Sequence, residues 1–142
     1  MTIDSSGRIS TPARPSFYAY DTSNVWVTLN SSTEVVMTLT EHNIGNHYST
    51  STGRFTVPVA GLYFFSGKLY TNNSSGASAF YVATNGTLSS RSFYNVQENT
   101  AGDTSLTFAE VRELSVGDYV SLFGYQGEYY TGHSTFSGYL IG

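Results

Sequence analysis

The residues best suited to binding chemistry lie in residues 124–133, which read GYQGEYYTGH and contain Tyr125, Tyr129, Tyr130 and His133. A tyrosine ring offers a large contact area with few rotatable bonds and one hydroxyl group. An imidazole adds a nitrogen donor and acceptor. The stretch therefore predicts non-covalent ligand binding, including hydrogen bonds to sugar hydroxyls. The alternative is that these rings pack on their own loop or on a neighbouring subunit, and the sequence leaves both open.

Two other polar loops are expected beside this stretch. Residues 71–78 and 95–104 are rich in Asn, Ser and Thr. Because strand direction reverses at each turn, both loops and residues 124–133 should lie at one end of the molecule, opposite an N-terminal tether. Asn72 and Asn73 are accordingly predicted to supply further polar contacts to a ligand.

The sequence predicts neither catalysis nor a cofactor. It contains no Gly-x-Ser-x-Gly elbow, no phosphate-binding glycine loop and no His-Glu-x-x-His motif. His42 and His47 flank a turn near Glu41, but isolated loop histidines are far commoner than metal ligands. The loop carboxylates that calcium could use are Glu98, Asp103 and Glu128. They are widely spaced along the chain, whereas calcium needs six or more converging oxygens, so no metal site is predicted and calcium at these loops stays open.

Composition narrows the class of protein. The chain has 142 residues, which suits one domain, and it has no cysteine. Its net charge is −4 and Lys68 is its single lysine, which argues against binding nucleic-acid phosphates. No apolar run reaches the 18 or so residues of a membrane span, so membrane insertion is not expected. Aromatic residues reach 15% and charged residues only 11%, a balance that favours strands and turns.

Short β-like runs recur from Pro15 onward at the spacing of a sandwich or barrel. Residues 1–14, with Pro12 and few apolar residues, are predicted to be an extended tether. Residues 15–142 are predicted to form one all-β head. The ten expected strands are residues 16–20, 24–29, 33–39, 54–59, 61–71, 78–85, 89–95, 105–111, 118–125 and 135–141.

Three of these strands are apolar on both faces. Residues 54–59 alternate apolar and polar side chains, but residues 16–20, 61–65 and 135–141 carry apolar or aromatic side chains on both sides. A strand that is apolar on both sides is usually buried on both faces of its sheet. The three are therefore expected to share one sheet whose outer face is a subunit interface, although single surface tyrosines are also tolerated. The predicted interface residues are Phe17, Tyr18, Tyr20, Tyr63, Phe65, Tyr139 and Ile141.

The aromatic and glycine pattern resembles a known family. The residues that carry the resemblance are Asn43, Tyr48, Phe55, Gly61, Tyr63 and Phe65, together with LSVGDYVSL (114–122) and STFSGYLIG (134–142). With them, residues 15–142 resemble the globular head of complement C1q, within the tumour-necrosis-factor-like (TNF-like) jelly-roll superfamily. Two positions depart from the pattern. Met37 lies where the family pattern has a phenylalanine. Gly67 lies where the pattern has its closing aromatic residue, and it leaves a space that a neighbouring side chain must fill.

The resemblance implies a ten-strand jelly-roll sandwich that assembles as a homotrimer. Its inner sheet would contain the first, middle and last strands and face the threefold axis, and residues 54–59 would lie in the outer sheet. Separately, residues 3–17 are similar to the openings of small structural proteins of tailed, especially marine, bacteriophages.

The leading hypothesis is a non-enzymatic trimeric virion module, the knob of a phage fibre or spike that binds a host-surface receptor such as a glycan. Residues 1–14 would then attach it to other virion proteins. The first alternative is a capsid-decoration or structural virion protein without receptor binding, and the second is a secreted bacterial lectin-like protein.

Overall fold

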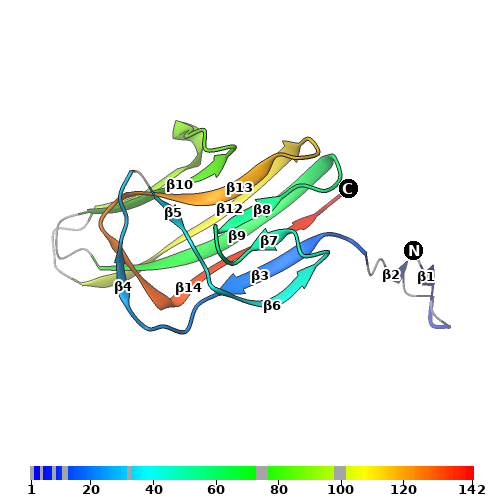
Figure 1. Ribbon diagram of the computed structural model, residues 1–142, viewed down its shortest axis with the longest axis horizontal. Coiled ribbons are helices and arrows are strands. Elements are labelled where there is room, and N and C mark those ends of the chain that lie inside the picture. Colours follow the sequence, from blue (N-terminus) through cyan, green and yellow to red (C-terminus); the bar gives the residue numbers. More distant parts are fainter. Residues whose placement is uncertain are drawn as a thin grey trace.

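A computed structural model describes residues 2–3, 5–7, 9–10, 13–31, 33–72, 77–97 and 102–142. Most of them form two six-stranded antiparallel sheets stacked face to face, as Figure 1 shows. The predicted all-β fold is therefore confirmed. Among the described residues, no helix is long and apolar enough to cross a membrane.

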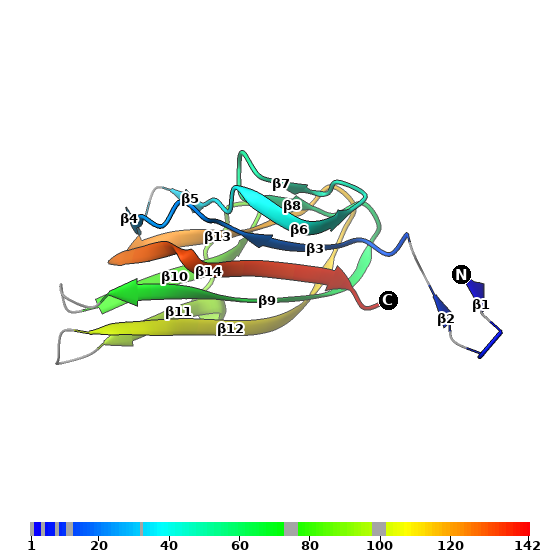
Figure 2. The ribbon, with the colours of Figure 1, turned by 90° about the horizontal axis from the view of Figure 1, so that it is seen from below.

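The first sheet, called here the β9 sheet, has the strand order β12-β9-β14-β3-β6, with β4 paired to β14. Figure 2 shows these strands side by side. Their bounds are β3 (Ser16–Tyr20), β4 (Trp26–Thr28), β6 (Leu39–Ile44), β9 (Gly61–Asn72), β12 (Asp103–Leu114) and β14 (Glu128–Leu140). The first, middle and last predicted strands thus lie next to one another, as expected.

The second sheet, the β13 sheet, has the order β11-β10-β13-β8-β7, with β5 paired to β13. It contains β8, which is part of the alternating apolar and polar segment 54–59, and the resemblance placed that segment in the outer sheet. The bounds are β5 (Glu34–Val35), β7 (Tyr48–Ser49), β8 (Arg54–Thr56), β10 (Ala77–Thr84), β11 (Phe93–Gln97) and β13 (Tyr119–Gln126), and a 3-10 turn, η1 (Ser90–Ser92), precedes β11.

A separate two-stranded sheet lies outside the sandwich. It pairs β1 (Thr2–Ile3) with β2 (Ile9–Ser10), within the residues predicted to be a tether. This small hairpin and the C-terminus lie at the same end of the sandwich in Figures 1 and 2. The turn between β13 and β14 lies at the opposite end, called here the distal end.

Aromatic side chains from both sheets fill the space between them. Phe17 of β3 stacks on Phe55 of β8 with ring centroids 5.0 Å apart, and it meets Phe136 of β14 edge to face at 4.9 Å. Such ring pairs stabilise a core beyond the area they bury. Because successive strand residues point to opposite faces, this core fixes which side chains are left on the outer faces.

Several predicted boundaries are wrong. Residues 40–46, predicted as a turn, lie largely in β6, and residues 33–39 are divided between β5 and the start of β6. Residues 124–133, predicted as a loop, continue β13 and β14 around a tight turn at Gly127, where φ is 87°. In the described part of the chain the two sheets contain twelve strands, not ten, because residues 33–39 contribute to both β5 and β6 and because β7 lies where no strand was predicted.

Candidate functional site

The outer face of the β9 sheet holds four of the predicted interface residues. Tyr18 and Tyr20 are half-buried there, and Tyr139 and Ile141 are 45% and 40% exposed. Phe64, which the prediction omitted, packs against Tyr139 with ring centroids 5.5 Å apart. These side chains point away from the core, as an interface requires, and the interface itself stays a prediction.

The other three predicted interface residues do not lie on this face. Phe17, Tyr63 and Phe65 are fully buried between the two sheets. Assigning them to an interface is wrong, because strand alternation turns them toward the β13 sheet while their sequence neighbours face outward.

The predicted ligand contacts are likewise divided between different surfaces. Tyr129 is only 4% exposed and lies in the core, so its ring cannot meet a ligand. Tyr125 lies on the β13 sheet, where it packs edge to face against Tyr81 and Phe93. Asn72 ends β9 opposite Asp103 in the strand pairing. Asn73 lies outside the described residues.

Two of the predicted residues, Tyr130 and His133, do come together on the outer face of the β9 sheet at its distal end. Their rings are 5.2 Å apart. With three residues that the sequence reasoning did not connect to them, Trp26, Tyr70 and Asp103, they line an open hollow of about 250 Å³. This set of five residues is called the cup below.

The rings of the cup are inclined to one another by different angles. Trp26 lies 5.2 Å from Tyr130 with an interplanar angle of 57°, and 6.1 Å from Tyr70 at 30°. Tyr70 meets His133 at 5.2 Å and 78°. The rings therefore form inclined walls and not a single flat plate.

An irregularity in β14 places Tyr130 and His133 on the same face. Between two paired positions β14 advances five residues, Tyr130 to Thr135, while β9 advances only two, Tyr70 to Lys68. The buried hydroxyl of Ser134 holds this irregularity, since it accepts from the Tyr70 amide at 3.0 Å and donates to the Tyr130 carbonyl at 2.7 Å. A bulge of this kind re-aims side chains that regular alternation would separate.

The segment before β4 positions Trp26. The buried Thr131 accepts hydrogen bonds through its hydroxyl from the Val25 amide at 3.1 Å, and its own amide donates to the Val25 carbonyl at 3.0 Å. Asp21 fixes the turn further back by accepting from the Ser23 amide and the Thr38 hydroxyl, both at 2.6 Å. Burial alone would raise the pKa of Asp21, but these hydrogen bonds outweigh it, so the pKa is lowered and the carboxylate stays charged.

Asp103 supplies negative charge to the cup. Its Oδ2 accepts a hydrogen bond of 3.0 Å from the Tyr70 hydroxyl. That hydrogen bond, with a smaller contribution from burial, raises the pKa of Tyr70, so the phenol stays protonated and its donor keeps pointing at the carboxylate. The sequence alone suggested Asp103 only as a dispersed calcium candidate.

A second hollow of about 380 Å³ lies on the same outer face, between the cup and the residues around Tyr139. The side chains of Tyr18, Tyr20, Glu41, Lys68 and His133 contribute to its walls. The chain's one lysine thus stands in the middle of a largely aromatic face.

The described side chains do not assemble a metal centre. No group of three or more His, Asp or Glu residues converges among them. What the cup offers chemically is π faces, hydroxyl groups, one imidazole and one carboxylate, which suits reversible binding of a small group.

Comparisons with known proteins agree with the fold. Complement C1q tumor necrosis factor-related protein 3 of Mus musculus is 33% identical over 115 residues, which cover 79% of this chain and 46% of that protein. The chain therefore spans about half the length of this relative.

Two solved structures have similar folds. The globular domain of zebrafish complement 1qA protein gives a TM-score of 0.72 at 17% identity and covers 90% of this chain and 98% of its own. Eiger TNF from S. frugiperda gives a TM-score of 0.75 at 10% identity, and the match covers 92% of this chain and 94% of that structure. A family model described as the C1q domain matches residues 16–141. The chain belongs to the C1q domain family.

Proposed function

We propose that this chain is a non-enzymatic binding head that assembles as a homotrimer through the outer face of the β9 sheet. The observation that carries the proposal is the cluster of outward aromatic and aliphatic side chains near the termini. This cluster, called the base patch, consists of Tyr18, Leu62, Phe64, Tyr139 and Ile141. Contiguous exposed apolar surface of this kind marks interaction sites in soluble proteins.

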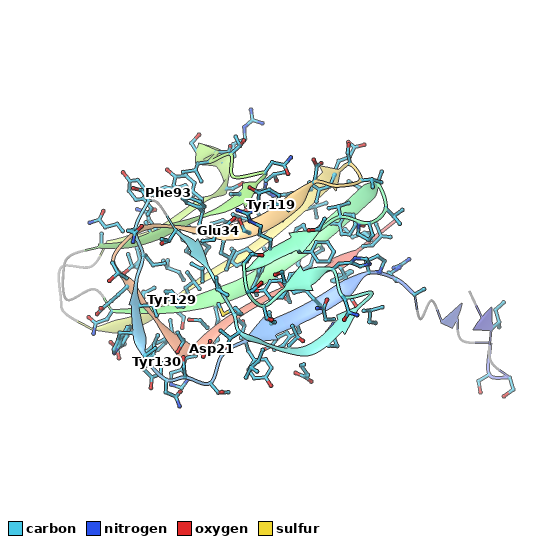
Figure 3. All side chains as sticks on the ribbon, in the orientation of Figure 1. Asp21, Glu34, Phe93, Tyr119, Tyr129 and Tyr130 are labelled. Atoms are coloured by element: carbon cyan, nitrogen blue, oxygen red, sulfur yellow. The ribbon has the colours of Figure 1, made fainter. Side chains whose placement is uncertain are left out.

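The outer face of the β13 sheet offers a useful contrast. There Arg54 forms an ion pair of 2.8 Å with Glu34, and its guanidinium lies 4.3 Å from the centroid of the Tyr119 ring; Figure 3 labels Glu34 and Tyr119 on this side. Paired charges are suited to a surface in contact with water. The β13 sheet also carries outward aromatic side chains, Tyr81, Phe93 and Tyr125, so the choice of the β9 sheet for the subunit contact rests on the base patch and on the paired charges of the other face.

Light scattering on the purified chain tests the assembly, with Tyr139→Glu as the disrupting variant. Tyr125→Glu is the matched control, because Tyr125 is 47% exposed on the other sheet and Tyr139 is 45% exposed. We expect wild type and the control to have the mass of a trimer and Tyr139→Glu to dissociate, since an obligate interface buries upwards of roughly 2,000 Å². A monomeric wild type at micromolar concentration would overturn the proposal.

We propose the distal end as the ligand-binding end, with Tyr130 and His133 of the cup as contacts. The cup lies six residues along β9 from the base patch (Phe64 to Tyr70), about 20 Å at the usual rise per residue. A trimer would repeat it three times, so weak single contacts would gain from effective concentration on a target with matching spacing.

A virion setting is a separate proposal that rests on the sequence of residues 3–17, and the relatives named above come from animals. Adsorption of the tagged trimer to candidate host cells distinguishes the two virion roles, a receptor-binding knob and a decoration protein. Binding that is lost in Tyr130→Ala supports a receptor-binding knob. Failure to adsorb to any host of a phage that carries the protein favours the decoration role.

A further inference from the structure

We propose that the cup binds an organic ammonium cation of the quaternary type carried by choline, held by the faces of Trp26, Tyr70 and Tyr130 and by the carboxylate of Asp103. This inference deepens the proposed function by naming the ligand class of the distal site, and it rests on that function for the site's role. The five described residues of the cup all belong to one chain, so its binding can be measured whether or not the chain assembles.

The shape and composition of the cup's walls favour a compact cation. Three electron-rich rings meet at interplanar angles of 30°, 57° and 69° around one hollow. The face of an aromatic ring carries the negative part of its quadrupole, so a cation over several such faces is attracted by all of them. A flat sugar ring needs one broad plate for stacking, whereas inclined walls fit a compact, rounded group.

The negative charge of the cup also favours a cation. Asp103 is the acidic residue in the cup, and its carboxylate is oriented by the 3.0 Å hydrogen bond from Tyr70. A cation gains from both this carboxylate and the rings. A neutral sugar could use the carboxylate as a hydrogen-bond acceptor but would gain no attraction between opposite charges, and an anion would be repelled by it.

The ring surfaces of the cup favour a quaternary over a primary ammonium. A primary ammonium carries three N–H donors that need acceptors when water is removed. Four of the five cup side chains are aromatic, and the acceptors are the Asp103 carboxylate, the two tyrosine hydroxyls and the His133 imidazole. A primary ammonium would have to turn its donors toward these acceptors and away from the ring faces. A quaternary ammonium has no N–H donor, so burying it among rings leaves nothing unsatisfied.

Trp26 makes the proposal directly measurable, because it is the chain's single tryptophan. Fluorescence titration of the full chain with choline, at constant ionic strength, should give saturable quenching. The neutral carbon isostere 3,3-dimethylbutan-1-ol has the same shape without the charge. We expect its affinity to be lower than that of choline by a factor of about ten or more. Equal binding of choline and the alcohol would overturn the proposal, as would no response to choline.

Variants assign the effect to the cup. Asp103→Asn should weaken choline binding about tenfold and leave binding of the neutral alcohol unchanged. Tyr130→Leu should weaken both ligands, and Tyr125→Leu on the opposite sheet should affect neither. Circular dichroism confirms that each variant is folded. An Asp103→Asn variant with wild-type affinity for choline would contradict the proposal, and quenching by a methyl pyranoside in place of choline would reassign the cup to sugars.

Light scattering on the same samples separates this inference from the assembly proposal. A wild-type trimer that does not bind choline, when the Tyr139→Glu variant does not bind it either, overturns the ligand class alone. A monomer that binds choline overturns the assembly and supports the cup. If Tyr139→Glu binds choline and the wild-type trimer does not, assembly covers the cup, and its role as the trimer's ligand site is wrong.

Discussion

The ring of Phe108 occupies the space that a side chain at Gly67 would need. The two residues face each other in the pairing of β12 with β9. A Cβ atom at Gly67 would lie 2.9 Å from the Phe108 ring and 2.3 Å from the carbonyl oxygen of Thr135 on the other neighbouring strand. The missing side chain at residue 67 is thus replaced by a ring from the adjacent strand, as the sequence pattern required.

Gly67→Ala should therefore destabilise the fold. Because a backbone oxygen cannot move aside cheaply, we expect the free energy of unfolding to fall by about 1–3 kcal/mol, the usual effect of overfilling a packed core. Urea unfolding followed by circular dichroism measures it. Gly102→Ala is the control, since nothing lies within 4 Å of a Cβ atom at that position. Equal stability of the two variants would show that the core at Gly67 can expand.

Much of the sandwich could be predicted from sequence because alternation and aromatic spacing are local signals. Asn43 and Tyr48, two residues of the family pattern, show how local such a signal is, because they are only five positions apart in the chain. The side-chain amide of Asn43 donates to the backbone carbonyl of Tyr48 at 2.8 Å and accepts from its backbone amide at 3.0 Å. Alternation shows that residues 17 and 18 face opposite ways. It does not show which of the two faces the partner sheet, and this is why Phe17, Tyr63 and Phe65 were misassigned.

The cup could be predicted only in part. Tyr130 and His133 stand out in a tyrosine-rich stretch, but their union with Trp26 and Tyr70 depends on the pairing register and on the irregularity in β14. Neither leaves a local mark in the sequence. Tyr129 and Tyr130 are the same residue type, but Tyr129 is buried because it faces the core, and Tyr130 is half-buried because it faces the cup (Figure 3).

Tyr48→Phe should lower stability without altering the shape of the core. The Tyr48 hydroxyl accepts from the Met37 amide at 3.2 Å and donates to the Met37 carbonyl at 3.3 Å, and both residues are buried. Removing the oxygen leaves the two backbone groups unsatisfied, so we expect a loss of about 1–3 kcal/mol in urea unfolding. A change within experimental error would mean that these backbone groups find other partners.

Arg112 and Glu110 form a mostly buried ion pair of 2.7 Å on the inner face of β12, with side chains 16% and 12% exposed. Arg112 also donates to the Val82 carbonyl at 2.7 Å, and so ties β12 to β10 across the sandwich. Arg112→Met should reduce the free energy of unfolding by about 3–5 kcal/mol, because the Glu110 carboxylate loses its counter-charge.

The double variant Glu110→Gln/Arg112→Met is the control for this ion pair, since it removes both charges. We expect it to recover most of the lost stability. If it is as unstable as Arg112→Met alone, then lost packing and lost hydrogen bonds dominate, and the unpaired charge is not the cause.

Melting of the head should be insensitive to a chelator. The described residues contain no converging group of three His, Asp or Glu side chains, so calcium removal should leave the melting temperature unchanged. Differential scanning calorimetry with and without EDTA, before and after calcium addition, measures this. A large drop in melting temperature would show that carboxylates from different subunits meet to form a site.

Stability should fall steeply in alkaline solution because buried tyrosines hold their protons more tightly in the folded state. Burial, with the negative charge of Asp21, raises the pKa of Tyr129 from 10.0 to about 12. Burial and the hydrogen bond to Glu110 raise the pKa of Tyr94 from 10.0 to about 12. Above the unfolded-state pKa the unfolded chain binds fewer protons than the folded one, so the free energy of unfolding decreases as pH rises.

The loss should begin near pH 10 and continue to about pH 12, the interval between the ordinary and the raised pKa of both tyrosines. Urea unfolding across this range, with tyrosinate absorbance recorded in parallel, measures the slope and the ionisation together. Tyr129→Phe removes one of the titrating groups and should give a shallower slope than wild type. If that variant loses stability as steeply as wild type, the Tyr129 phenol is not held neutral by the fold, and other groups account for the alkaline transition.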